Sequence, residues 1–354
     1  MISRIWHRFV FDEYQTSSES LVLFRTLFAA LLLALWVPRY LWIPKFPDSF
    51  FRPPLGPTAL FVTGFPPSWV FIALNIVFVG AVVCLLTGRY VVTATCLTTG
   101  ALLFGNAWAY SFGKIDHDIL LVIAPLFLLA AGWDGKRQAC AWPMALFALT
   151  IAAAMFTAAF QKASSGWLDP TASAVFGHGL RNAIADHRES TAWHMAVQVL
   201  PFAAWKMADY STLVFEAGFL VAMFRRRSFL ILCAIACVFH FGVTLLMQIV
   251  FLTNVMAYAA FVHWDQVAAR LTIRDTMSKV QTWLERRTDV ELLVAAGVLG
   301  AVSLQWRHPL LAVLPRIRAA ISLLLMAIAM IASVTFIAAQ AWRMSPWRAQ
   351  RPER

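Results

Sequence analysis

Lys162 is the residue whose position in this sequence most clearly suggests chemistry. It closes a long apolar run, and a turn containing Gly166 and Trp167 follows it, so its amine lies at the edge of an apolar segment rather than out in a loop. An ammonium group loses hydration there, which makes the charged form costly to hold. Lys162 therefore either extends along its aliphatic stem to the lipid headgroups or works as a chemical base.

Three further ionisable residues lie within or beside apolar runs. His117 begins one run, Glu216 lies about two helical turns inside another, and His240 lies in the run 228–262. We expect all three to meet Lys162 at one depth in the outer leaflet, because ionisable groups inside a membrane usually mark a cavity or a proton path. Each also has a structural explanation. His240 could bond a neighbouring carbonyl, Glu216 could pair with a basic residue, and His117 could be an interfacial loop residue.

Familiar catalytic motifs are missing from the sequence. It contains no GxGxxG, GxxxxGK[ST], HExxH, CxxC or GxSxG pattern, so nucleotide-driven transport, metalloprotease and serine hydrolase chemistry have no support. His178, His187 and His194 share one segment, but carboxylates and cysteines at ligand spacing do not accompany them. We therefore expect no metal site.

Composition indicates the class of protein that must position these residues. Apolar residues make up 60% of the 354 residues and charged residues only 13%, against about 25% charged in an ordinary soluble domain. The mean hydropathy is +0.70. We therefore predict an all-α, polytopic transmembrane helical bundle of about nine spans, since helices satisfy their own backbone groups in lipid.

The basic balance of the chain is explained by a membrane better than by nucleic acid. The formal net charge is +11, and the basic residues gather in short clusters beside apolar runs, at Arg89, at Lys136 and Arg137, and at Arg225 to Arg227. With the N-terminus in the cytoplasm, all these clusters face the cytoplasm, as the positive-inside rule asks. We expect the lipid bilayer of a bacterial cytoplasmic (inner) membrane as the partner and no nucleic acid.

The run lengths divide the chain into three parts. Residues 1–19 form an interfacial amphipathic helix, residues 20–264 a transmembrane domain, and residues 265–354 a basic loop, further transmembrane helices and an arginine-rich cytoplasmic tail. Arg25 lies one turn inside the first span, where we expect it to reach the headgroups or to form a buried ion pair. The expected spans are 21–41, 69–86, 90–109, 119–131, 142–161, 210–224, one or two helices in 228–262, 292–304 and 319–342.

Several short motifs occur in an order and spacing that resemble a known family. They are Leu21 to Phe28 (LVLFRTLF), Asp116 to Leu121 (DHDILL), Lys162 with Trp167, Phe215 to Phe219 (FEAGF), and Phe239 and His240 with Phe251. Over residues 17–264 the chain resembles the horizontally transferred transmembrane (HTTM) family, to which the vitamin K-dependent gamma-glutamyl carboxylase belongs.

The resemblance implies a role for each candidate residue. Lys162 would be the base that deprotonates a reduced quinone of the vitamin K or menaquinol type, with His117 and His240 as further catalytic, orienting groups. Trp167 and Glu216 would bind the cofactor, and no metal is expected. The implied reaction is oxygen-dependent: the quinol becomes an epoxide while a strong base removes the gamma proton of a glutamate.

The chain also departs from the family pattern. Gly242 and Val243 follow Phe241 where an asparagine often accompanies the family's histidine. After Trp264 the sequence offers a basic loop and two apolar runs in place of the large extracytoplasmic domain of the animal enzyme. The substrate, a secreted peptide or protein or a small molecule, therefore stays open.

Two other functions are compatible with the same residues. The chain could be a non-enzymatic membrane partner in the export, maturation or immunity of a secreted peptide, with Lys162 and Trp167 as interface anchors. It could also be a proton-coupled transporter that uses Glu216 and His240. Whether the protein is an enzyme is thus not decided by the sequence.

Overall fold

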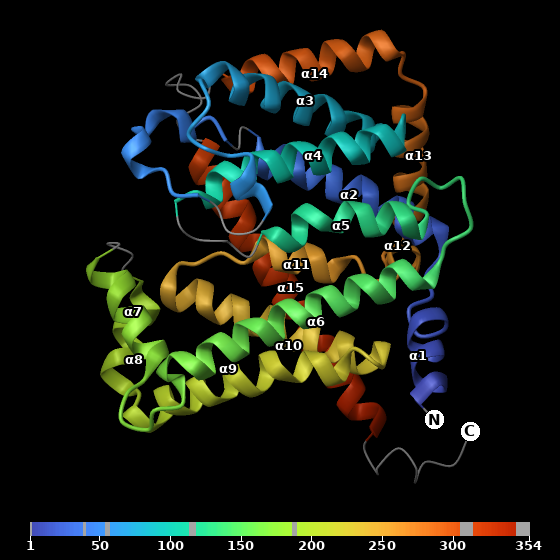
Figure 1. Ribbon diagram of the computed structural model, residues 1–354. Coiled ribbons are helices and arrows are strands. Elements are labelled where there is room, and N and C mark those ends of the chain that lie inside the picture. The colour runs from blue at the N-terminus through green and yellow to red at the C-terminus, as the bar shows by residue number, and fades with distance from the viewer. Residues whose placement is uncertain are drawn as a thin grey trace, which may run out of the picture. The chain divides into compact units, whose positions relative to one another are not determined.

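The computed structural model describes residues 2–37, 40–53, 57–112, 118–185, 190–304 and 314–344, and every regular element in these ranges is helical (Figure 1). Within them, six helices are long and apolar enough to cross a membrane. The predicted all-α fold is confirmed, and the chain is a membrane protein with transmembrane helices. The six are α2 (Ser18–Trp36), α3 (Ser68–Thr87), α4 (Val91–Tyr110), α6 (Ala141–Lys162), α10 (Arg226–Met247) and α15 (Leu314–Met344).

The other helices are shorter or carry more charge. In the run 228–262, for which the sequence leaves one or two helices open, the full-length α10 is followed by the eight-residue α11, because Gln248 adopts a left-handed φ of 53° that ends α10. One prediction was wrong: the charged segment 265–289, interpreted from the sequence as a loop, is largely helical. These remaining helices are α1 (Ile2–Phe11), α5 (Ile119–Ala131), α7 (Ala174–Ile184), α8 (Thr191–Val199), α9 (Phe202–Ala222), α11 (Leu252–Ala259), α12 (Trp264–Arg270), α13 (Arg274–Glu285) and α14 (Asp289–Leu304).

The chain forms two compact units, each made of segments that are separated in the sequence. Their boundaries differ from those of the three parts expected from the sequence. Unit 1 takes in the described parts of residues 1–14, 145–258 and 321–354, and unit 2 those of 15–144 and 259–320. In unit 2, α2, α3, α4 and α5 pack in succession and α14 lies along α3 (Figure 1). In unit 1, α9 and α10 lie side by side and the short helices α7 and α8 pack on them (Figure 1).

Arg25 in unit 2 is buried, so the expectation that it extends to the headgroups is wrong. Its side chain donates a 2.8 Å hydrogen bond to the Trp133 carbonyl, just beyond the end of α5. A Cβ on Gly88, which ends α3 with a φ of +73°, would lie 2.7 Å from the Arg25 guanidinium. The guanidinium thus contacts the C-terminal ends of two helices, where the partial negative charge of the backbone favours a cation.

Contacts within unit 1 attach α1 to the link between α9 and α10. The Tyr14 hydroxyl donates a 2.6 Å bond to the Met223 carbonyl, and the Glu13 carboxylate accepts a 3.1 Å bond from the Arg226 amide. Phe224 packs against the edge of Trp6, with ring centroids 5.4 Å apart. Burial raises the pKa of Tyr14 above its ordinary range, so its hydroxyl keeps its proton and acts as the donor.

Candidate functional site

Lys162 and Glu216, predicted from the sequence as parts of one site, form an ion pair in unit 1. Lys162 is the last residue of α6, and its Nζ bonds Oε1 of Glu216 in the middle of α9. The lysine side chain is 26% exposed and the glutamate side chain 8%, so the pair is open to its surroundings from the lysine side. The second carboxylate oxygen of Glu216 is buried without a hydrogen-bond partner among the described residues.

The turn after α6 sets Trp167 beside this pair. Helix α6 passes into a single wide turn over Ala163–Trp167, in which Gly166 takes a φ of 92°. A Cβ at Gly166 would meet nothing within 4 Å, so the glycine is required by its left-handed backbone rather than by lack of space. The indole ring returns to within 5.3 Å of the Lys162 Nζ, a cation–π distance. The turn therefore places the Trp167 ring against the Lys162 ammonium.

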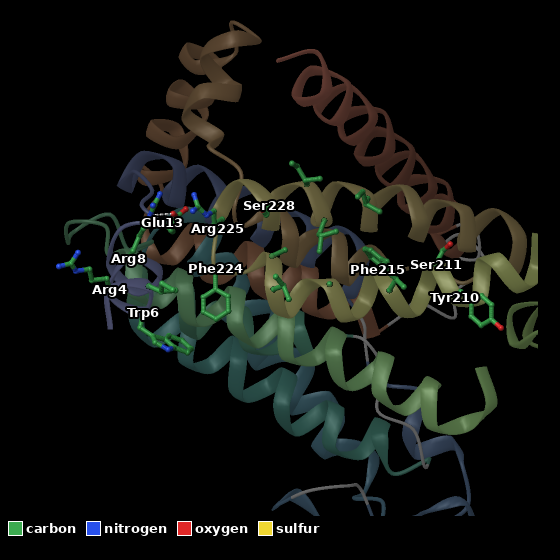
Figure 2. A pocket seen from close by; sticks show the side chains of 18 of the residues that line it. Arg4, Trp6, Arg8, Glu13, Tyr210, Ser211, Phe215, Phe224, Arg225 and Ser228 are labelled. Atoms are coloured by element: carbon green, nitrogen blue, oxygen red, sulfur yellow. Dashed lines mark ion pairs between the residues drawn. The ribbon is translucent and has the colours of Figure 1, made fainter. Parts of the chain in front are cut away.

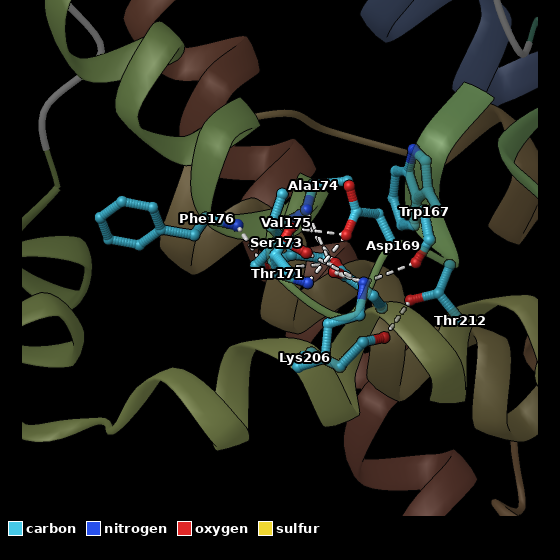
Figure 3. Close-up of polar contacts among 12 residues, drawn as sticks. Trp167, Asp169, Thr171, Ser173, Ala174, Val175, Phe176, Lys206 and Thr212 are labelled. Carbon is cyan, nitrogen blue, oxygen red and sulfur yellow. Dashed lines mark hydrogen bonds and ion pairs between the residues drawn. The ribbon is translucent and has the colours of Figure 1, made fainter.

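A second lysine, which unlike Lys162 is buried and which sequence reasoning missed, holds the same turn from its backbone side (Figure 3). Lys206 in α9 is 6% exposed. Its Nζ donates to the carbonyls of Trp167, at 2.7 Å, and Ala172, at 3.0 Å, and to the Asp209 carboxylate at 3.1 Å. The ammonium thus has three acceptors, which accounts for its burial. The signal that could have revealed it is the spacing of Lys206 and Asp209, three residues apart in an otherwise apolar stretch.

Asp209 extends this network to the start of α7. It is fully buried and accepts hydrogen bonds from the amides of Ala174, at 3.0 Å, and Val175, at 2.8 Å, and a 3.4 Å bond from the Ser173 hydroxyl. The first amides of a helix have no partner within the helix, and the N-terminal end of the dipole favours an anion. Asp209 therefore fixes α7 to α9, and Lys206 fixes the turn of Trp167 to both.

His240 lies in α10, 4% exposed, in an aromatic setting. Its Nε2 is 3.3 Å from the Tyr258 hydroxyl in α11, and its ring stacks on Phe251 with centroids 4.5 Å apart. The Tyr258 ring also stacks on Phe219 of α9, with ring centroids 6.3 Å apart. Tyr258, which sequence reasoning did not select, therefore links His240 to α9, the helix that carries Glu216.

The structure brings together two of the four predicted ionisable residues, Lys162 and Glu216, and a tyrosine connects the third, His240, to the helix of Glu216. All four residues belong to unit 1: Lys162 lies in α6, Glu216 in α9, His240 in α10 and Tyr258 in α11. His117 lies outside the described residues, as does His187, so the predicted role of His117 stays a prediction.

Comparison with known proteins does not assign this chain to a family. No protein-family model, no characterised protein and no solved structure gives a significant match to the chain. The resemblance to the HTTM family rests on the motifs quoted above, and the geometry of Lys162 and its neighbours carries the functional argument.

Proposed function

We propose that this chain is a multi-pass protein of a bacterial cytoplasmic membrane, with a cytoplasmic N-terminus, that carries out proton-transfer chemistry on a reduced quinone. The proposal follows the HTTM resemblance. The single observation that carries it is the partly buried Lys162–Glu216 pair beneath the Trp167 ring. Ionisable groups in apolar surroundings are costly and usually serve a function.

The pair can hold one proton in two places. In the charged form the proton is on the Lys162 Nζ, and in the neutral form it has moved to the Glu216 carboxylate. Poor solvation disfavours separated charges, so it narrows the free-energy gap between the two forms. With its proton on Glu216, the Lys162 amine has a free electron pair and can accept a proton from a quinol hydroxyl. In this step one proton passes from the quinol to the pair, which then holds two, and the pair returns to its starting state when one proton leaves from the exposed lysine side.

The residues around Lys162 fit a flat, mostly apolar ligand with a hydroxyl group. The Trp167 ring offers an aromatic face, and the quarter-exposed amine lies within 5.3 Å of the ring's centre. When bound, a reduced quinone would supply the reducing equivalents for an oxygen-dependent reaction on a secreted peptide or a small molecule. His240 would act as an orienting group through Tyr258, and we keep the same role for His117 from the resemblance.

The test is quinol oxidation by purified protein in nanodiscs, with menaquinol and vitamin K hydroquinone supplied separately. The wild type is compared with Lys162→Ala and with Lys279→Ala, a control lysine on the exposed surface of α13. The proposal predicts epoxide formation by the wild type and the control and its loss in Lys162→Ala. Absence of epoxide with both quinols, in wild-type protein shown to be folded, would overturn it.

One observation favours a second candidate, a non-enzymatic partner for a secreted peptide. Helices α7 and α8 expose large apolar side chains, among them Ile184 at 67%, Met195 at 63% and Val199 at 76%. Exposed apolar groups beside a bundle can receive a peptide. Under this alternative, Ile184→Ser would abolish function in cells while Lys162→Met would not, the reverse of what the enzymatic proposal predicts.

A further inference from the structure

A second feature of unit 1 has a different character from the Lys162 site. A groove of about 1780 Å³ runs between α1, α9 and α10, and neither Lys162 nor Glu216 lines it (Figure 2). Pockets for small molecules usually measure about 300 to 1,000 Å³, so this groove suits a longer ligand. Its walls are largely apolar and include Trp6, Val214, Phe215 and Phe224.

The charges on the groove gather at one end. Arg4 and Arg8 from α1 and Arg225 at the start of α10 lie there with Glu13, while Tyr210 and Ser211 lie at the other end (Figure 2). Glu13 pairs with Arg8, with 2.7 Å between the two charged groups, so this end keeps an excess of positive charge from Arg4 and Arg225. Both of these arginines are exposed. An anionic group is the complement of this end.

The length of the groove matches one leaflet of a bilayer with its headgroup region. Its lining on α9 extends from Met207 to Ala222, which at about 1.5 Å per residue is roughly 22 Å. Half of a typical bilayer measures about 15 Å of hydrocarbon and about 20 to 22 Å with the headgroup region. Gly218, about two thirds of the way along this lining, has no side chain to fill the groove, and a Cβ there would make only an ordinary 3.5 Å contact with Leu232. An extended acyl chain fits this length and lining.

We propose that the groove binds one anionic phospholipid, with its phosphate at Arg4 and Arg225 and an acyl chain between α9 and α10. Such a lipid would join α1 to the paired helices, in addition to the bonds of Tyr14 and Glu13. The inference does not depend on the proposed quinol chemistry, because no residue is shared between the two sites.

Native mass spectrometry of the full chain in detergent tests the proposal. Phosphatidylglycerol and phosphatidylcholine with identical acyl chains are titrated separately, and inorganic phosphate forms a third arm. We expect one phosphatidylglycerol to bind in preference to phosphatidylcholine. The double variant Arg4→Gln with Arg225→Gln should weaken phosphatidylglycerol roughly 30-fold, from the usual contribution of two basic residues beside an anionic headgroup. The matched control, Arg270→Gln with Arg286→Gln on the exposed surface of the other unit, should change nothing.

A second variant tests the acyl-chain part of the groove. Gly218→Leu places a side chain in the groove and should reduce binding of both lipids, in protein that keeps its helical circular dichroism and remains monodisperse. Equal binding of the two lipids to the wild type would overturn the proposal. So would phosphatidylglycerol binding that survives both sets of variants. Inorganic phosphate that binds at these arginines while phosphatidylglycerol does not bind would show that the arginines take a free anion and that the groove takes no lipid.

Discussion

Replacing Lys206 by Met removes the charge at the centre of the polar network behind Trp167 while keeping most of the side-chain volume. The variant deletes three hydrogen bonds and leaves the fully buried Asp209 without its countercharge. Removing one partner of a buried ion pair typically costs 3 to 5 kcal/mol. Asp209 keeps the donors from the first turn of α7, so we expect a loss of about 3 kcal/mol, or roughly two orders of magnitude in the unfolding equilibrium.

The loss is measured as the change in free energy of unfolding in a titration of mixed micelles with sodium dodecyl sulfate, followed by circular dichroism. Lys279→Met, on the exposed surface of α13, is the control and should stay within about 0.5 kcal/mol of the wild type. The double variant with Asp209→Asn should show a coupling above about 1 kcal/mol between the two positions. A loss for Lys206→Met no larger than that of the control would refute the reasoning.

Two smaller predictions concern the same part of unit 1. Gly179→Ala should cost about 1 to 3 kcal/mol, because its Cβ would lie 2.0 Å from the Trp193 ring, whereas Gly177→Ala in the same helix meets nothing within 4 Å and should not destabilise in the same titration. The hydroxyl and amide of Thr171 hold the pKa of Asp169 below its ordinary value of 3.8. Ionised Asp169 therefore stabilises the fold at neutral pH, and this contribution is lost as the pH falls through the folded-state pKa. Thr171→Val should raise that pKa in a carbon-13 NMR titration of the carboxyl, and an unchanged titration would contradict the assignment.

The helical bundle can be predicted from the sequence because it depends on local features of the chain. Long apolar runs in a chain with few charges can satisfy their backbone in lipid only as helices, and the six long apolar helices coincide with predicted spans. The pairing of Lys162 with Glu216 and its nearness to Trp167 were also accessible, because all three residues stand out against apolar neighbours.

The start of α9 was missed because it is stabilised by residues that are distant in the sequence. The predicted span begins at residue 210, after the charged Lys206 and Asp209, yet α9 begins at Phe202 and buries both residues. Their burial is compensated by the Trp167 carbonyl and by the amides that begin α7, more than thirty residues earlier in the chain. No local pattern contains these contacts. Tyr258 was missed for a similar reason, since its bond to His240 joins two separate helices.

The helical content of residues 265–289 also depends on distant contacts. The Ser17 hydroxyl donates a 2.8 Å bond to the Asp265 carboxylate, and the Trp264 amide donates a 2.8 Å bond to the Ser20 hydroxyl, both within unit 2. These bonds hold the start of α12 to the start of α2. Charge density alone indicated a loop, because a short polar helix has little intrinsic stability without such contacts.

Chemical rescue of Lys162→Ala tests the central claim, that the Lys162 amine is the base, most directly. Quinol oxidation by the variant in nanodiscs is followed with and without added ethylamine, beside the wild type. If the Lys162 amine is the base, ethylamine should restore epoxide formation to the variant. The rescue should be stronger at higher pH, because only the neutral amine can accept a proton. Full activity of Lys162→Ala without any amine would contradict the account.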